Sequence, residues 1–399
     1  MFQRERVIAA LEAKADRFAG YETELSDALA GYEQALAELA GLNRTEVEAR
    51  LAGVPWPGAW PTVEHDQHPG IVVPFGQTWA NHEQARAWAR DVLASVPTVA
   101  VDGSQITPSK DISVPVGAVQ IGWFVNPHEG DQGYVKDITF EVLAPNELAG
   151  EDEAVLGFPD WRVNERRFVL ECEKLVETMQ AAREAAAQGA DVKPVCFFDG
   201  SLVISFVQHM LPERQKQYVE AVISLLAASE ECRVPLVGYV DTSYANDLAA
   251  MLDALAGRRT RQRISDGALL RPRMQWGDRT VAHICARDDK VLPVGGGKYY
   301  DRVCFVYLKT TADRPPARLD LPRWLLEAGE LEHTLDVVRA ECVVGNGYPY
   351  TVETADAVAV ITMQDRERFY RVFQGFAEKE GLPLRFSRKA VSKRGRRTL

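Results

Sequence analysis

The chain has 399 residues, 46% of them hydrophobic and 26% charged, so it is long enough and apolar enough to bury a full core. Its formal net charge of −11 argues against a protein that coats nucleic acid through bulk electrostatics. No apolar run reaches the length of a membrane span, the first residues resemble an amphipathic helix instead of a signal peptide, and the six cysteines form no Cys-x-x-Cys pair. We therefore expect a cytoplasmic protein with no membrane segment, no zinc site and no disulfide framework.

Residues 2–41 carry a heptad pattern. Large apolar residues repeat every seven positions, at Leu11, Phe18, Leu25, Tyr32 and Leu39. This spacing predicts a helical arm that packs against a partner helix, in this chain or in another. Gly20 and Gly31 weaken the helix, so the pattern fits a bent hairpin as well as one rod.

The first strand predicted after the arm ends in an acid. Residues 98–104 read Thr-Val-Ala-Val-Asp-Gly-Ser, which places Asp102 at the tip of a buried strand, before a Gly-Ser turn. Two strand-like stretches follow, at 112–125 and 134–143. Sequential strands joined by short turns predict an antiparallel meander.

Strands and helices then alternate. A long amphipathic helix is predicted over 164–188, and the strand at 195–199 repeats the first phrase and ends in Asp199. A further helix, a strand at 234–240 and a helix at 244–255 continue the βαβα order that implies parallel pairing. A meander followed by this alternation is the order of a ribonuclease H-like domain. We therefore predict an α/β fold with a mixed sheet flanked by helices, in which the two strand-tip acids lie side by side.

The last third of the chain begins with an Arg- and Gly-rich segment. We interpret residues 257–297 as an irregular insertion. The elements predicted after it are a buried strand at 303–308, a core element at 335–344 whose pattern fits helix or strand, and helices at 350–361 and 364–380. We divide the chain into a helical arm with a Pro- and Trp-rich loop at 1–78, a main domain at 79–380, and a basic tail at 381–399.

Positive charge is concentrated in two places. The tail carries seven arginines and lysines between residues 385 and 397, with no acid among them. The second cluster consists of Arg258, Arg259, Arg261, Arg263, Arg271 and Arg273. In an acidic protein, such local clusters are candidates for contacts to a polyanion.

The two strand-tip acids are the strongest chemical signal. Asp102 and Asp199, on neighbouring strands, could hold divalent cations between them, because Mg²⁺-like ions prefer carboxylate oxygens. Ordinary Asp-Gly turn chemistry is the alternative for either copy alone. A third carboxylate is expected from the helix between them. There Glu171 lies about 80° from the centre of the apolar stripe and Glu173 about 115° on its other side, so geometry prefers Glu171 only slightly.

Several separated motifs resemble the NurA nucleases, which act in DNA end resection with the HerA hexameric ATPase. The motifs lie in order between about residues 79 and 393, at residues 100–104, 165–167 followed by 171, 198–202, 238–240, 305–309, 322–324 and 347–350. The resemblance implies a ribonuclease H-like fold, a ring-shaped homodimer, and dependence on Mn²⁺, with Mg²⁺ as the alternative ion. It also implies cleavage of single-stranded DNA with 5′ to 3′ exonuclease action in double-strand break repair, and it favours Glu171 as the third acid.

One position departs from the family pattern. After the Gly-Tyr-Pro phrase the family has a histidine in an Ala-His pair, whereas this chain has Ala355-Asp356. An aspartate can coordinate a metal ion, but it cannot act as a neutral imidazole ligand or as a proton donor near pH 7. Asp356 is therefore a candidate for a further metal ligand.

These patterns together predict a metal-dependent DNA nuclease. Asp102, Glu171 and Asp199 are the expected catalytic acids and metal ligands. The candidates for contacts to DNA phosphates are Lys309, Arg258, Arg259, Arg261 and Arg263. The alternative is a catalytically weak subunit that binds DNA ends or clamps onto the ATPase, with the aspartates kept for folding. A metal-dependent nuclease assay separates the two.

Overall fold

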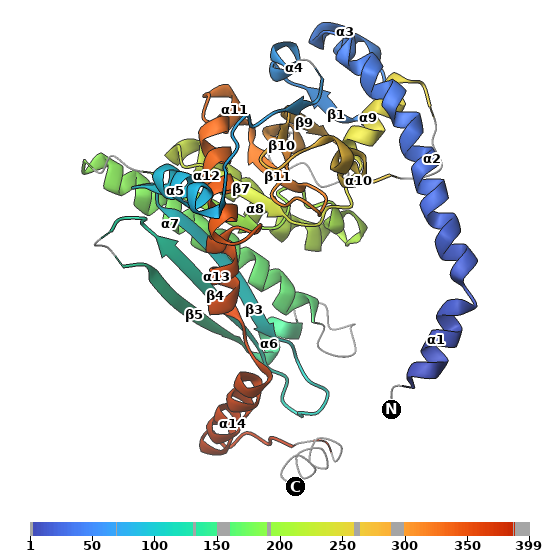
Figure 1. The fold of residues 1–399 in the computed structure, drawn as a ribbon. Coiled ribbons are helices and arrows are strands. Elements are labelled where there is room, and N and C mark those ends of the chain that lie inside the picture. The colour runs from blue at the N-terminus through green and yellow to red at the C-terminus, as the bar shows by residue number, and fades with distance from the viewer. Residues whose placement is uncertain are drawn as a thin grey trace. The chain divides into compact units, whose positions relative to one another are not determined.

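The computed structural model describes residues 3–68, 70–130, 133–149, 160–189, 193–258, 264–288, 299–385 and 387. These residues form two compact units. Unit 1 comprises the described residues within 1–78, 240–290 and 298–326, and unit 2 those within 79–239 and 327–399. Figure 1 shows the course of the chain, with many of its helices and strands labelled.

Unit 2 is built on a mixed sheet. Its strands are β3 (Thr98–Ile106), β4 (Gly117–Asn126), β5 (Val135–Leu143), β6 (Val195–Asp199) and β7 (Leu236–Val240). They lie in the order β5-β4-β3-β6-β7, with antiparallel pairing from β5 to β3 and parallel pairing of β6 with both β3 and β7. A meander extended by parallel strands in this order is a ribonuclease H-like sheet. The predicted fold class is confirmed.

The central strands follow from their apolar content. Residues 195–198 of β6 are all buried, as are residues 98–101 of β3. A strand covered on both faces shows such an unbroken apolar run instead of alternation. The runs end at the two aspartates, so the sequence itself brings the acids to the edge of the core.

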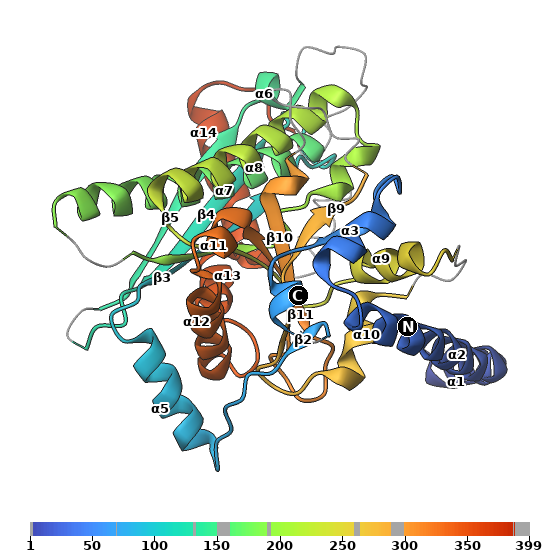
Figure 2. The same cartoon turned by 90° about the horizontal axis from the view of Figure 1, so that it is seen from above.

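Helices cover both faces of this sheet (Figure 2). A Cβ at Gly103 of β3 would touch α7 (Trp161–Ala187), whereas a Cβ at Gly122 of β4 would touch α13 (Tyr350–Ala359). Gly122 pairs with Asp102, the neighbour of Gly103, and successive residues of a strand point to opposite faces. Helices α7 and α13 therefore lie on opposite sides of the strand that carries Asp102.

Unit 2 contains further helices, namely α5 (His82–Leu93), α6 (Pro145–Ala149), η1 (Ser205–His209), α8 (Pro212–Cys232), α12 (Leu331–Val344) and α14 (Met363–Lys379). Of the helices of this unit, α8, α12, α13 and α14 fall in predicted segments. Helix α12 resolves the ambiguity at 335–344 in favour of a helix. Helices α13 and α14 confirm the last two predicted helices.

Unit 1 has its own strands, which pair in antiparallel fashion. These are β1 (Gly58–Pro61), β2 (Val72–Val73), β8 (Arg279–Thr280), β9 (His283–Ala286), β10 (Val303–Leu308) and β11 (Ala317–Pro322). The order is β1-β9-β10-β11, with β8 pairing β10 and β2. The segment expected to be irregular, residues 257–297, thus contributes β8 and β9, which are too short to stand out by periodicity.

The helices of unit 1 are α1 (Arg4–Glu12), α2 (Ala15–Ala40), α3 (Arg44–Leu51), α4 (Glu64–Gln67), α9 (Asp247–Leu255), α10 (Asp266–Leu270) and η2 (Arg271–Arg273), together with η3 (Tyr300–Arg302) and α11 (Arg323–Glu327), which begins in this unit. None of the helices within the described ranges combines the length and apolar content that a membrane span requires.

The predicted heptad arm consists of α1 and α2. The helix is interrupted at residues 13–14, not at either glycine. Tyr32 and Leu39 at its C-terminal end are buried in unit 1, whereas Leu11 and Phe18 are 53% and 60% exposed. The C-terminal part of the heptad stripe is therefore covered by unit 1, whereas its N-terminal part is exposed.

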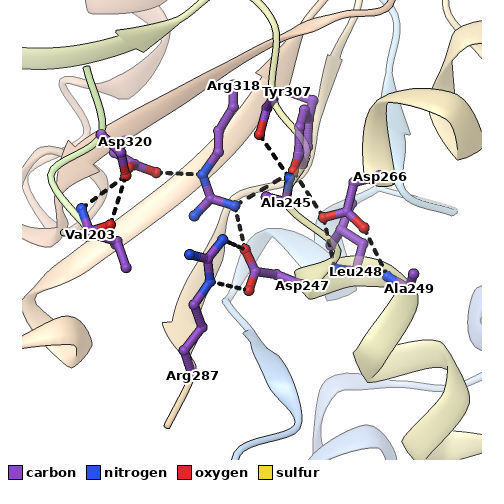
Figure 3. Close-up of polar contacts among 12 residues, drawn as sticks. Val203, Ala245, Asp247, Leu248, Ala249, Asp266, Arg287, Tyr307, Arg318 and Asp320 are labelled. Atoms are coloured by element: carbon purple, nitrogen blue, oxygen red, sulfur yellow. Dashed lines mark hydrogen bonds and ion pairs between the residues drawn. The ribbon is translucent and has the colours of Figure 1, made fainter. Parts of the chain in front are cut away.

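The core of unit 1 contains a network of buried charges (Figure 3). Arg318 of β11 donates hydrogen bonds to Asp247 and Asp320. Arg287 forms a bidentate ion pair with Asp247, with N···O distances of 2.5 and 2.7 Å. Asp266 accepts hydrogen bonds from two backbone amides in the first turn of α9, at 2.9 and 3.0 Å. Because a buried charge without a partner is strongly unfavourable, this network fixes which strands and helices of unit 1 meet.

Candidate metal centre

Strands β3 and β6 bring two acids together. Asp199 ends β6, whereas Asp102 lies inside β3, which continues to Ile106 in pairing with β4, so the turn predicted directly after Asp102 is wrong. In the parallel register Val101 lies opposite Phe198, so that the next residues, Asp102 and Asp199, are neighbours on adjacent strands. Residues opposed in this way point to the same face of a sheet. Asp102 is half-buried and Asp199 is exposed. The two acids are neighbours on adjacent strands as predicted, but only Asp199 lies at a strand end.

Asp356 approaches from the helix that covers this face. It is exposed on α13, and its charge contributes to a raised pKa of Asp102, which places the two carboxylates close together. The approach of α13 depends on Gly122, which pairs with Asp102. A Cβ there would stand 2.7 Å from the backbone nitrogen of Ala359, a distance that excludes any larger residue.

Glu171 comes from the other side of the strand, on α7. Its side chain is buried, and one of its oxygens, Oε1, would lie only 2.5 Å from a Cβ at Gly103. Among the described residues, Glu171 Oε1 has no hydrogen-bond partner. The glycine after Asp102 thus makes room for a carboxylate whose buried oxygen lacks a donor.

Two further side chains orient these acids. Arg167, one helical turn before Glu171, donates a hydrogen bond from Nη1 to the carbonyl of Gly103 at 3.0 Å, and its Nε lies 3.6 Å from Glu171 Oε1. The hydroxyl of Tyr348 donates to Asp199 Oδ1 at 3.2 Å. Sequence reasoning did not single out either residue, although both lie in motifs that carry the family resemblance.

Burial and mutual repulsion both raise the pKa values of Asp102 and Glu171. Burial raises the pKa of Asp102 to about 6, and the charges of Asp199 and Asp356 add to the rise. Burial likewise raises the pKa of Glu171 to about 8, with Asp102 and Asp199 adding and Arg167 opposing. Negative charge therefore exceeds positive charge at this point of the protein, which is the condition that a bound cation relieves.

The chemistry of these residues fits a divalent metal ion. No group of three or more His, Cys, Asp or Glu side chains in the described ranges is already arranged to hold one. The donors are nevertheless of the right chemistry, since Mg²⁺ and Mn²⁺ take carboxylate oxygens. The unpartnered oxygen of Glu171 and the raised pKa values of two acids also fit a cation that would join them.

Of the residues predicted to contact DNA, Lys309 and Arg258 belong to unit 1. Lys309 is 2% exposed, donates from Nζ to the carbonyl of Arg314, and has a pKa lowered by burial and by the charge of Arg271. Arg258 is exposed and donates to the carbonyl of Gly31 at 2.6 Å. Arg259, Arg261 and Arg263 lie outside the described residues, as does the tail from residue 388 onward. Their role stays a prediction.

A ribonuclease H-like sheet with neighbouring acids on its first and fourth strands defines a class of metal-dependent phosphodiester hydrolases. The sequence matches the NurA domain family over residues 96–361, well over half of the chain. The chain belongs to the NurA family of nucleases, and at the level of the family the prediction of a deoxyribonuclease is confirmed.

Solved structures show further similarities. The NurA nuclease from Sulfolobus solfataricus is 13% identical, with a TM-score of 0.49, and the match covers 95% of this chain and 98% of that one. Endonuclease V from Bacillus subtilis is 15% identical with a TM-score of 0.29, covering 77% and 97%. The catalytic domain of human endonuclease V is 15% identical with a TM-score of 0.31, covering 78% and 93%. None of the curated proteins compared with the chain matches it significantly.

Proposed function

We propose that this NurA-family protein hydrolyses DNA with divalent metal ions held by Asp102, Glu171 and Asp199, and that Asp356 is a further ligand. The observation that carries the proposal is the convergence of these acids from two strands and a helix, with one buried Glu171 oxygen left without a hydrogen-bond partner in the described part of the chain. Bound divalent cations would activate water and stabilise the leaving oxygen.

The surrounding side chains hold this constellation in place. Arg167 of α7 donates a hydrogen bond to the Gly103 carbonyl and forms an ion pair with Glu171. It therefore joins helix α7 to the strand that carries Asp102. Tyr348 donates a hydrogen bond to Asp199 Oδ1 and so orients this carboxylate. Residues that orient a metal ligand in this way are typically worth a factor of about 10–100 in metal affinity or activity.

Family membership supports the finer parts of the proposal. These are single-stranded endonuclease and 5′ to 3′ exonuclease activity, Mn²⁺ or alternatively Mg²⁺ as the ion, and a role in end resection and double-strand break repair with a HerA-type hexameric ATPase. The arginines at 258, 259, 261 and 263 are proposed to contact DNA phosphates. Lys309, predicted from the sequence to do the same, is 2% exposed and donates to the carbonyl of Arg314, so it is not part of this proposal. A cytoplasmic location fits the six cysteines, which are all free and buried.

A homodimer is part of the same proposal. It is supported by the exposed N-terminal part of the heptad stripe, where Leu11 and Phe18 lie on the surface of helices α1 and α2. Removing residues 1–20 should lower the solution mass measured by light scattering if the arm joins two copies. An unchanged mass would place the dimer contact elsewhere or show a monomer.

One observation favours a second candidate, a catalytically weak subunit that binds DNA ends or the ATPase. Asp356 stands where the family has a histidine, so the site has one more negative charge and lacks an imidazole. In this case the protein would bind DNA but not cleave it.

The test is a cleavage assay on labelled single-stranded DNA with Mn²⁺, Mg²⁺ or EDTA. The nuclease proposal expects products only with metal, and expects Asp102→Asn to abolish them while leaving the circular dichroism spectrum unchanged. DNA binding without cleavage in either metal would establish the second candidate. A gain of activity in Asp356→His would then identify the substituted position as the cause.

A further inference from the structure

Unit 2 carries a chain of aromatic rings that begins beside the proposed metal ligands. The ring of Phe198, which precedes Asp199, lies edge-on against Phe168 of α7 at 5.7 Å between centroids. Phe168 contacts Tyr218 of α8 at 5.0 Å and Phe206 of η1 at 6.3 Å. Phe198, Phe168 and Tyr218 are buried, whereas Phe206 is 51% exposed. The rings therefore lead from the strand of Asp199 to the surface.

Two arginines stack on a tryptophan at the start of the same helix. The guanidinium carbons of Arg162 and Arg214 lie 4.4 and 4.0 Å from the ring centre of Trp161. Trp161 Nε1 and Arg162 Nε are buried, and neither has a hydrogen-bond partner among the residues that the structure describes. The half-buried guanidinium groups of Arg162 and Arg214 thus lie against one indole ring, and guanidinium groups are strong hydrogen-bond donors to phosphate oxygens.

The arginines, the rings and the acids are neighbours. Tyr218 lies one helical turn after Arg214 on α8, and its ring contacts both Phe168 and Phe206, with 5.4 Å between the centroids of Tyr218 and Phe206. Glu165 is the acid next to Arg162 and Arg214, and burial raises its pKa, which favours its neutral form. Along α7, the helical rise from Trp161 to Glu171 is about 15 Å, a distance of a few nucleotides.

We propose that Phe206, Arg162 and Arg214 form a binding site for single-stranded nucleic acid next to the candidate metal centre. The guanidinium groups contact phosphates, and the exposed ring of Phe206 stacks on a base. Exposed aromatic rings beside arginines are how proteins bind single strands without sequence preference. The inference deepens the proposed nuclease function, because it states where the strand lies as it reaches the acids.

The test is fluorescence anisotropy with a labelled oligothymidylate in EDTA, so that no cleavage occurs. Phe206→Ala should raise the Kd by at least about fivefold, because each stacked base contributes a factor of this order or more. Phe206→Trp should keep the wild-type Kd. Arg214→Gln should raise the Kd and reduce the slope of log K against log salt by about 0.7, the loss of one phosphate contact.

The matched control is Phe376→Ala, since Phe376 of α14 is 52% exposed but lies outside the cluster. It should bind like the wild type. The inference is overturned if Phe206→Ala binds within twofold of the wild type, or if Phe376→Ala weakens binding equally. Because Phe206 is exposed, its truncation leaves the core intact, and the thermal midpoint of each variant confirms folding.

The nuclease proposal and this inference fail in different ways. A wild-type protein that binds the oligonucleotide through Phe206 but cleaves nothing with Mn²⁺ contradicts the nuclease proposal and supports the binding site. A wild-type protein that cleaves, with Phe206→Ala unchanged in Kd and in the KM for DNA, contradicts the binding site alone.

Discussion

Both units bury carboxylates, but the groups that surround these carboxylates differ between the two units. In unit 1, Asp247 is paired with Arg318 and Arg287, and Asp266 accepts hydrogen bonds from the amides of α9. In unit 2, Asp102 and Glu171 face other carboxylates, and one buried oxygen of Glu171 has no hydrogen-bond partner in the described part of the chain, with Arg167 Nε 3.6 Å away as its ion-pair partner. The first arrangement specifies a fold, because each charge finds its counterpart within the chain. The second costs stability in the metal-free protein, which is acceptable where a ligand supplies the missing charge.

The largest effect is expected from removing a charge at the unit 2 acids. Asp199→Asn should lower the rate of Mn²⁺-dependent cleavage by about 10³-fold or more, because a lost ligand charge removes several kcal/mol of transition-state stabilisation. Glu173→Gln is the control, since Glu173 is an exposed acid on α7. Equal rates for the wild type and Asp199→Asn would show that the ions are held elsewhere.

The same change, from aspartate to asparagine, should in unit 1 lower the stability of the fold instead of the cleavage rate. Asp247→Asn leaves Arg318 and Arg287 without their shared carboxylate, and breaking a buried pair in this way costs about 3–5 kcal/mol. Urea unfolding should show this loss for Asp247→Asn, whereas Asp199→Asn should unfold like the wild type in EDTA. If both variants lose stability equally, the contrast between the two units is wrong.

Unit 1 also buries a neutral histidine, which predicts a pH dependence. Burial lowers the pKa of His283 to about 4, with the nearby His65 adding to the decrease and Asp247 opposing it. Above the ordinary value of about 6.5, both folded and unfolded chains hold a neutral ring. As the pH falls from 6.5 toward 4, only the unfolded chain takes up the proton, so folding stability is lost.

This loss amounts to about 2 kcal/mol between pH 6.5 and 5. The free energy of unfolding of His283→Gln should therefore change less over this range than that of the wild type, by about that amount. Parallel pH curves for the two proteins would show that the ring is protonated in the folded state.

A smaller effect is expected at Tyr348, which orients Asp199. Tyr348→Phe keeps the ring and removes the hydroxyl, so Mn²⁺ should bind about tenfold more weakly. The fold should be unaffected, since Tyr348 keeps its edge-on contact with Tyr239. Calorimetric titration with Mn²⁺ measures this affinity directly. An unchanged affinity would show that the hydrogen bond from Tyr348 to Asp199 does not contribute to metal binding.

The comparison also shows which parts of the fold the sequence could reveal. The unbroken apolar runs of β3 and β6 end in Asp-Gly-Ser, so both strands and both acids were predictable. Strand β11 was missed because Arg318 and Asp320 alternate with apolar residues, a pattern that resembles a half-exposed strand or a loop. Both charged residues are in fact buried, and the partners that make this favourable come from distant segments.

The candidate site was predictable only in part, for the same reason. Helical geometry barely separated Glu171 from Glu173, whereas the structure shows Glu171 buried beside Gly103 and Glu173 exposed. Arg167 and Tyr348 carry no local sign of their roles, because each acts on a residue from another element. Only the pairing of β3 with β6 and the crossing of α7 reveal them.

The most direct test of the account is calorimetric titration of Mn²⁺ into the wild type, Asp102→Asn and Glu171→Gln at pH 7.5, with Glu173→Gln as the control. The account predicts saturable binding to the wild type and to Glu173→Gln, and at least about tenfold weaker binding to the other two variants. Equal binding by all four proteins would contradict the assignment of Asp102 and Glu171 as metal ligands.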